Sequence, residues 1–179
     1  MYLFLFDFFF YWYHRAEHYF SLLWPIHELH HSDAELNATS SQRSHRLEQP
    51  LQNMLIFFPT IYIIGYNEVS VYAFSIVLTI ILVFSHSNIK LRMGMWTSVI
   101  CGPQLHRIHH SIHPEHNNKN YAQVFPIIDI VFGTFYMPQN DEFPETGTYE
   151  IKSDEEVLQT FMKPFKYWFH TFKRRIGKN

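Results

Sequence analysis

Residues 54–84, MLIFFPTIYIIGYNEVSVYAFSIVLTIILVF, are apolar except where Gly65-Tyr66-Asn67-Glu68 interrupts them. A helix that crosses a membrane needs about 20 apolar residues, so each arm is somewhat short, whereas both arms together are too long for one straight span. The interruption combines a flexible glycine with polar residues that favour turns. We therefore predict a helical hairpin in a membrane. A buried hairpin of a soluble protein is the alternative that such apolar runs also allow.

Basic residues orient this hairpin. Arg43 and Arg46 precede its first arm, and Lys90 and Arg92 follow its second. Because basic residues favour the cytoplasmic side of a membrane, both ends of the hairpin are expected there. The polar, histidine-rich segments before and after the hairpin then lie on the same side, where they can meet.

The two ends of the chain differ in character. Residues 1–24 are largely apolar and aromatic, and they lack the basic start and the small-residue cleavage point of a secretory signal, so they predict a retained helix.

Residues 151–175 predict an amphipathic helix on the membrane surface. Its apolar face carries Val157, Phe161, Phe165 and Trp168. Its basic end is either a solvated tail or an anchor for anionic lipid. We divide the chain into a membrane domain, residues 1–150, and an amphipathic, basic tail, residues 151–179.

The composition excludes several classes of protein. A formal net charge of -2 leaves no basic stripe for nucleic acid. The single cysteine, Cys101, excludes a disulfide framework and thiolate-rich zinc or iron–sulfur sites. The sequence has no glycine-rich phosphate loop and no nucleophile elbow, so nucleotide-dependent and serine-hydrolase chemistry have no support. The unusual feature is histidine, of which the chain has 13.

These histidines recur at helical spacing. His14 and His18 are four residues apart, and the motif His-x-x-His-His occurs at residues 27–31 and again at 106–110. Residues at i, i+3 and i+4 share one helix face, so each motif can direct two or three imidazoles towards one point. With His86 they provide nine imidazoles, too many for one metal ion with open positions and about right for two. Neutral imidazole suits zinc, copper, iron and nickel, so the ligand type alone does not name the metal. The candidate ligands are His14, His18, His27, His30, His31, His86, His106, His109 and His110.

Other polar residues near these motifs are candidates for supporting roles. Acids are sparse there, and those that could bond the ligand imidazoles are Glu17, Glu28, Asp33 and Glu115. His113 and His116 either extend the second His-x-x-His-His motif or solvate a loop. We interpret His45 as a solvated histidine and assign His170 to the basic tail.

Five segments together resemble a known family. They are DFFFYWYHRAEH from Asp7, WPIHELHHSDAELNATSSQRSHRLE from Trp24, FSHSN around His86, LHRIHHS around His109 and KNYAQVFPIIDIVFGTFY from Lys119. In this order they resemble the fatty acid hydroxylase superfamily, which includes sterol desaturases and alkylglycerol monooxygenase. The resemblance covers the chain from Asp7 to about Gly147.

The resemblance implies a mainly helical, all-α integral membrane protein with a di-iron centre, O2 as oxidant and an oily substrate. On this basis the nine histidines would be the iron ligands. The positions that would lie near them are Asn88, Asn120, Tyr121 and Asp129, with His113 and His116 as further candidates. Family members usually carry further transmembrane helices before the first histidine motif. This chain is therefore expected to be a truncated or minimal form.

The implied reaction is O2-dependent hydroxylation of a C–H bond in a lipid, whether sterol, fatty acyl or related. The chain carries no flavin, haem or nicotinamide motif, so electrons are expected from an external electron-transfer protein or reductase. The alternatives are a lipid desaturase with the same site and a non-catalytic membrane metal-binding relative. Metal transport is disfavoured because the hairpin arms, residues 54–64 and 69–84, contain no charged residue and no histidine. The expected location is multi-pass in a bacterial inner membrane or the endoplasmic reticulum, with the site facing the cytoplasm.

Overall fold

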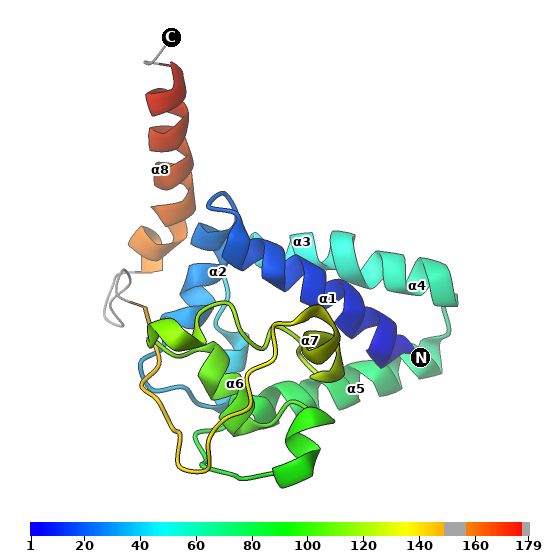
Figure 1. Ribbon diagram of the computed structural model, residues 1–179. Coiled ribbons are helices and arrows are strands. Elements are labelled where there is room, and N and C mark those ends of the chain that lie inside the picture. Colours follow the sequence, from blue (N-terminus) through cyan, green and yellow to red (C-terminus); the bar gives the residue numbers. More distant parts are fainter. Residues whose placement is uncertain (149–156, 177–179) are drawn as a thin grey trace.

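The computed structural model describes residues 1–148 and 157–176, and every regular element in these ranges is a helix. The helices in chain order are α1 (Tyr2–Tyr19), α2 (Trp24–His31), η1 (Ala38–Gln42), α3 (Glu48–Gln52), η2 (Asn53–Phe57), α4 (Phe58–Ile64), α5 (Glu68–Ser85), η3 (Gly94–Ser98), α6 (Pro103–His109), η4 (Pro114–His116), α7 (Ile127–Phe132) and α8 (Val157–Ile176). The prediction of an all-α fold is confirmed for the described residues. Figure 1 shows α1, α4 and α5 running side by side, with α2 and α6 gathered at one end.

The hairpin is present and turns where the sequence predicted. Its first arm is continuous from α3 through η2 to α4, and α5 returns as its second arm. Gly65 ends the first arm with φ +91°, a conformation that side chains strongly disfavour. Asn67 then caps α5, because its side-chain oxygen accepts a hydrogen bond from Ser70 N at 2.9 Å.

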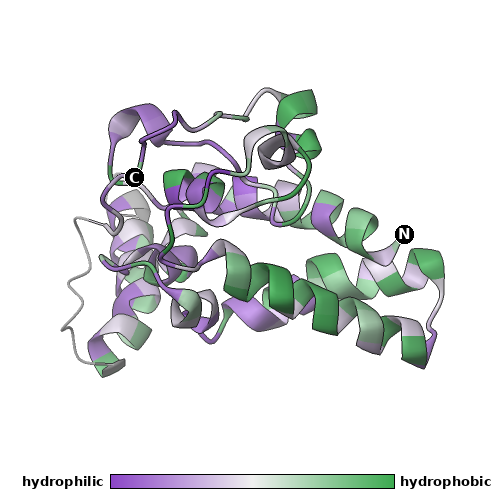
Figure 2. Ribbon diagram, turned by 90° about the horizontal axis from the view of Figure 1, so that it is seen from below, coloured by the Kyte–Doolittle hydropathy of each residue, from purple (hydrophilic) through white to green (hydrophobic). Residues whose placement is uncertain are grey.

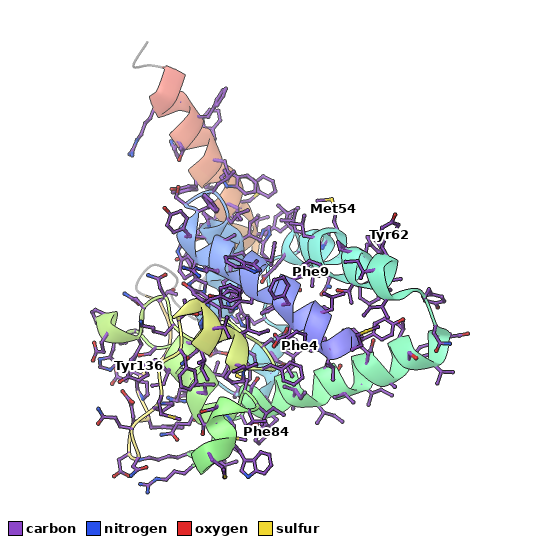
Figure 3. The ribbon with its side chains drawn as sticks, turned by 45° about the vertical axis from the view of Figure 1, so that its right-hand side comes forward. Phe4, Phe9, Met54, Tyr62, Phe84 and Tyr136 are labelled. Carbon is purple, nitrogen blue, oxygen red and sulfur yellow. The ribbon has the colours of Figure 1, made fainter. Side chains whose placement is uncertain are left out.

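One helix in the described ranges is long and apolar enough to cross a membrane. It is α5, whose 18 residues have a mean hydropathy of 2.1 and are only 17% buried. In Figure 3 Met54 and Tyr62 of the first arm also point away from the body, and they are 56% and 90% exposed. Exposed apolar side chains therefore cover both arms of the hairpin. That the chain crosses a membrane more than once remains a prediction.

Helix α1 packs against both arms of the hairpin. Phe6, Phe10 and Tyr13 of α1 form a buried cluster with Ile56 of η2 and Phe74 of α5. Each buried side chain of this size contributes roughly 1.5–3 kcal/mol relative to exposure in water. In Figure 2 these helices are largely hydrophobic, whereas the opposite end, with α2 and α6, is more hydrophilic. The packing thus presents the polar ends of α1 and α5 to the histidine-rich segments.

Helix α8 stands away from the body and runs across the direction of α1 and α5 in Figure 1. Lys163 at its base bonds Glu28 at 2.8 Å, and Trp168 Nε1 donates to Leu22 O at 2.9 Å. Phe161, Phe165 and Trp168 share one face as predicted, since the Phe165 ring centroid lies 5.7 Å from that of Phe161 and 5.5 Å from that of Trp168. This face packs partly against the body, because Phe161 and Trp168 are half-buried. Residues 149–156 and 177–179, which include both ends of the predicted tail, lie outside the described residues.

His45 is not the solvated residue that we predicted. It is 2% exposed, and its ring stacks on Phe161 at a centroid distance of 5.3 Å. Its Nε2 lies 3.1 Å from Phe161 O, while Leu47 N donates to its Nδ1 at 3.2 Å. His45 therefore fastens α8 to the body.

Candidate metal centre

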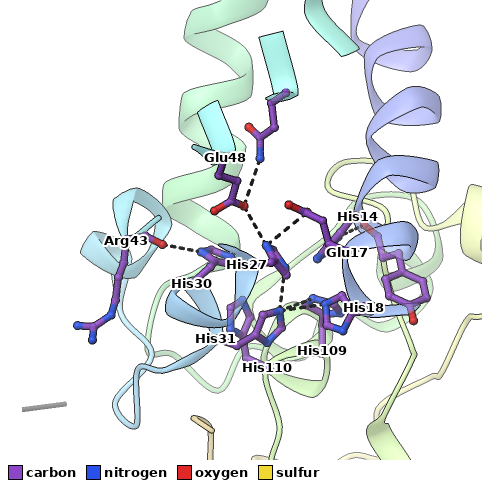
Figure 4. Close-up of polar contacts among 12 residues, drawn as sticks. His14, Glu17, His18, His27, His30, His31, Arg43, Glu48, His109 and His110 are labelled. Carbon is purple, nitrogen blue, oxygen red and sulfur yellow. Dashed lines mark hydrogen bonds and ion pairs between the residues drawn. The ribbon is translucent and has the colours of Figure 1, made fainter. Parts of the chain in front are cut away.

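All nine predicted ligand histidines meet at the polar end of the helices. Figure 4 labels those of α1 and α2, together with His109 and His110. They form two groups in which the nearest ring nitrogens lie within 4.8 Å of one another. The five-histidine group is His14, His18, His27, His31 and His109. The four-histidine group is His30, His86, His106 and His110. That these residues bind metal remains a prediction, which the geometry below supports.

Helical spacing explains how the two groups are built. α1 places His14 and His18 on one face, one turn apart, and His86 follows the last residue of α5. Neighbouring helical residues point about 100° apart. His30 and His31 of α2 consequently enter different groups, and so do His109 and His110 at the end of α6. α2 and α6 therefore join the two groups into one centre.

Backbone carbonyl groups fix the orientation of several rings. His14 Nδ1 lies 2.8 Å from Tyr121 O, and His109 Nδ1 lies 2.8 Å from Lys119 O. His30 Nδ1 and His86 Nδ1 lie 3.1 Å and 2.8 Å from Arg43 O and Leu82 O. A carbonyl oxygen only accepts, so Nδ1 carries the proton and the Nε2 lone pair faces the centre. This is the tautomer that a metal ligand needs.

The Nε2 atoms lie at separations that fit shared metal ions. His31 Nε2 is 3.1 Å from Nε2 of each of His18, His27 and His109. In the other group, His106 Nε2 is 3.0 Å from His86 Nε2 and 3.1 Å from His110 Nε2. Two ligands each about 2.1 Å from a metal lie about 3.0 Å apart at a right angle and about 3.4 Å apart at the tetrahedral angle.

The same separations are unfavourable without a cation, because neutral lone pairs would face one another. His14 Nε2 is buried and has no hydrogen-bond partner. A buried acceptor without a donor costs about 1–3 kcal/mol. The donor set therefore fits two metal ions, one in each group.

Burial keeps these imidazoles neutral. Loss of water around the rings lowers the pKa of His30 to about 4, although its hydrogen bond to the Arg43 carbonyl opposes the shift. Desolvation likewise lowers the pKa of His109 to about 4. At neutral pH both rings are free of the proton that would compete with a metal ion.

His27 contacts two buried carboxyl groups, as Figure 4 shows. Its Nδ1 is 2.9 Å from Glu48 Oε1 and 3.4 Å from Glu17 Oε2. Burial raises the pKa of Glu48 to about 8, since its charged form loses water. The sequence indicated Glu17 as a supporting acid but not Glu48, because no local motif connects Glu48 with His27. Glu28 and Asp33 instead bond Lys163 and Ser40, and Glu115 is exposed.

Three of the predicted supporting residues hold the loop behind His14 and His109. Asp129 accepts hydrogen bonds from Tyr121 N at 2.7 Å and Ala122 N at 2.8 Å. Asn120 Oδ1 accepts from Tyr136 N at 2.8 Å, and its Nδ2 donates to Tyr136 O at 3.1 Å. This loop supplies the Tyr121 carbonyl that faces His14.

The other predicted neighbours lie farther from the two groups. Asn88 Oδ1 accepts from Arg107 Nη1 at 3.1 Å. His116 lies between Ser111 Oγ and Glu142 Oε1, at 2.8 Å and 2.9 Å. His113 is beside His116, with ring centroids 5.8 Å apart. Neither histidine belongs to either ligand group.

Comparison with known proteins places this site in a family. The model of the fatty acid hydroxylase family matches residues 1–134. Alkylglycerol monooxygenase of Homo sapiens is 29% identical over 163 residues, which cover 90% of this chain and 36% of that protein. The Danio rerio alkylglycerol monooxygenase is 31% identical over 86% of this chain and 34% of that protein. Ornithine lipid hydroxylase of Rhizobium tropici is 30% identical over 92% of this chain and 49% of that protein.

The chain thus spans about a third to a half of the curated relatives it matches. No solved structure matches it. The family match covers most of the chain and includes all nine clustered histidines. The chain belongs to the fatty acid hydroxylase family.

Proposed function

We propose that this chain binds two iron ions at its nine clustered histidines and hydroxylates a C–H bond of a membrane lipid with O2. The observation that carries the proposal is the convergence of the imidazoles into two groups at the polar end of an apolar helical body. The relatives are named as a monooxygenase of alkylglycerol and a hydroxylase of ornithine lipid, which favours a lipid substrate.

Bound iron would supply the redox chemistry, with electrons from an external electron-transfer protein or reductase. The residues of this chain would hold and orient the ligands. The carbonyl groups of Arg43, Leu82, Lys119 and Tyr121 fix four rings, and Glu17 and Glu48 support His27. Phe10 and Leu82 line the cavity beside the centre, where they would exclude water.

We also propose that the protein is anchored in a membrane with the site facing the cytoplasm, either in a bacterial inner membrane or in the endoplasmic reticulum. α5 would cross the bilayer, with α1 and the first hairpin arm beside it. α8 would lie on the same surface as the site. The exposed apolar side chains of α5 and α4 support this arrangement.

The test begins with metal analysis of the protein purified in detergent. We expect about two irons per chain. His109→Ala removes a ligand from the five-histidine group and His30→Ala one from the four-histidine group, so each variant should lose iron. His113→Ala is the matched control, because His113 belongs to neither group. No metal, or iron content that neither ligand variant changes, would contradict the iron centre.

The reaction is tested with the reduced protein, a lipid extract and ¹⁸O2. A lipid product that carries one ¹⁸O atom is expected. A product that has lost two hydrogens without gaining oxygen would reassign the chemistry to desaturation. Iron binding without any lipid product would favour a non-catalytic relative.

A further inference from the structure

Two cavities meet beside the four-histidine group. The first, of about 140 Å³, is lined by His30, His86 and His106 and by the amides of Gln49, Gln52 and Gln123. The second, of about 260 Å³, lies among α1, η2 and α5 and is lined by Phe6, Phe57, Phe74 and Leu78. Gln49, Gln52, Gln123 and Leu82 line both cavities. The two spaces therefore adjoin, with three amides at their junction.

The apolar cavity lies on the membrane side of the histidines. Phe6 is two turns before His14 on α1, and Phe74 and Leu78 lie before His86 along α5. A molecule that occupied both cavities would contact the polar amides at the end near the histidines. Farther from the histidines it would contact the aromatic and aliphatic side chains. This order matches a lipid whose polar end is near the histidines and whose aliphatic chain extends along α1 and α5.

At the junction of the two cavities, Gln123 lacks a hydrogen-bond donor for its side-chain oxygen. Its side chain is 9% exposed, and its Oε1 has no hydrogen-bond partner. The backbone around it is fixed, because Gln123 N donates to Asp7 Oδ1 at 2.8 Å. A buried acceptor that lacks a donor is costly, so a ligand N–H or O–H would satisfy it.

We propose that the substrate is a lipid whose aliphatic chain occupies the cavity between α1 and α5, and whose polar linkage donates a hydrogen bond to Gln123. The linkage is an amide or carries a hydroxyl group. The C–H bond that reaches the histidines then lies within a few bonds of this linkage, not at the far end of the chain. The position of oxidation rests on the proposed function, whereas the binding site does not.

Binding is tested with a photoreactive probe on the purified protein in detergent. The probe is a long-chain N-alkyl amide with a diazirine at the middle of its chain. Saturable labelling of the α1 and α5 segments that line the apolar cavity is expected. Leu78→Trp fills the cavity and should reduce this labelling roughly tenfold. Ile80→Trp is the matched control, since Ile80 lies on the same helix and is 62% exposed.

Competition then tests the role of Gln123. The unlabelled amide should compete roughly fivefold better than the methyl ester of equal chain length, which has no donor, because one hydrogen bond to a buried acceptor contributes about 1 kcal/mol. Gln123→Leu should abolish this preference while leaving the iron content unchanged. Labelling that does not saturate, or that both tryptophan variants reduce equally, would overturn the binding site. An amide preference that survives Gln123→Leu would overturn the role of Gln123.

The ¹⁸O position separates this inference from the proposed function. Fragmentation of the product should place ¹⁸O within a few bonds of the polar linkage, and ¹⁸O at the end of the chain would overturn the orientation of the lipid. Saturable labelling without any ¹⁸O product would instead leave the binding site standing and count against the oxygenase.

Discussion

At the scale of single residues, side chains and backbone carbonyl groups fix the orientation of the imidazoles by contacting Nδ1, the ring nitrogen that faces away from the clusters. Glu48 is the clearest case, because its carboxyl group contacts His27 Nδ1 at 2.9 Å and is itself buried. Such a partner orients a ligand ring and increases its basicity.

Glu48→Ala should therefore weaken metal binding about 10-fold to 100-fold, whereas Glu48→Gln should retain more affinity because its amide oxygen can still accept from Nδ1. Competition with a chelator of known affinity measures the change. Glu35→Ala, at an exposed acid in the same part of the chain, is the control. Equal affinity in Glu48→Ala and Glu35→Ala would show that Glu48 does not support His27.

Asp129 lies one step farther from the clustered histidines, because it bonds the loop that supplies the Tyr121 carbonyl. Its removal leaves Tyr121 N and Ala122 N without their carboxylate partner, at a cost of about 1–3 kcal/mol for each buried group. Asp129→Ala should lower both the thermal unfolding temperature and the metal content, since the Tyr121 carbonyl behind His14 is displaced. Asp141→Ala should change neither, because the Asp141 side chain is 83% exposed. A stable Asp129→Ala protein with full metal content would contradict this role.

The sequence predicted which imidazoles come together but missed Glu48 among their partners, for a physical reason. Spacing along a helix decides which histidines share a face, so the motifs alone bring His27, His30 and His31 to one end of α2. The contacts of Glu48 with His27 and of Asp7 with Gln123 join positions 21 and 116 residues apart. Only tertiary packing brings such pairs together, and no local sequence pattern predicts which residues will meet.

At the scale of the elements, the hairpin was predictable because its interruption is polar and contains a glycine. Its first arm was harder to predict. A π-helical turn, η2, interrupts it just before Pro59, whose missing N–H weakens regular helical bonding. Helical spacing correctly grouped Phe161, Phe165 and Trp168 on one face of α8. Spacing alone did not show that part of this face packs against the body beside His45.

Gly65 offers a test of the hairpin turn. With φ +91° and ψ 152° it occupies a region that is essentially restricted to glycine, and a side chain there costs of order 1–3 kcal/mol. Gly65→Ala should lower the thermal unfolding temperature in detergent but leave the iron content unchanged, because the turn is at the end of the hairpin away from the histidines. A second variant, Ser87→Ala, replaces a half-buried side chain beyond the other end of α5. It removes one hydrogen bond to Val83 O, which lies at an exposed position, and should have little effect on unfolding. Unfolding temperatures that agree for both variants would rule out strain at Gly65.

At the scale of the whole molecule, α8 adds a second apolar surface that runs across the hairpin direction. Its exposed stripe consists of Leu158, Met162, Phe165, Phe169 and Phe172. Lys166 and Lys173 flank this stripe, and residues 157–179 contain no acid. An apolar stripe bordered by basic residues is typical of a helix that lies on an anionic membrane surface.

A spin label at Phe169→Cys, in nanodiscs that contain anionic lipid, should be protected from a water-soluble nickel chelate and accessible to O2. A label at Tyr167→Cys, on the other side of α8, should show the opposite pattern. Cys101 is fully buried and should not interfere. Equal exposure of both labels to the chelate would place α8 in water.

The long sequence separation between ligands has a consequence for biosynthesis. Of the two helices that join the histidine groups, α6 is made later than α2, so a nascent chain that ends before α6 carries four imidazoles of one group and two of the other. In the folded chain these four imidazoles present ring nitrogens within 4.8 Å of one another, and four ligands are the number that zinc favours. For the iron that we propose, delivery would therefore compete with an earlier opportunity for zinc, and rapid synthesis of α6 would favour iron.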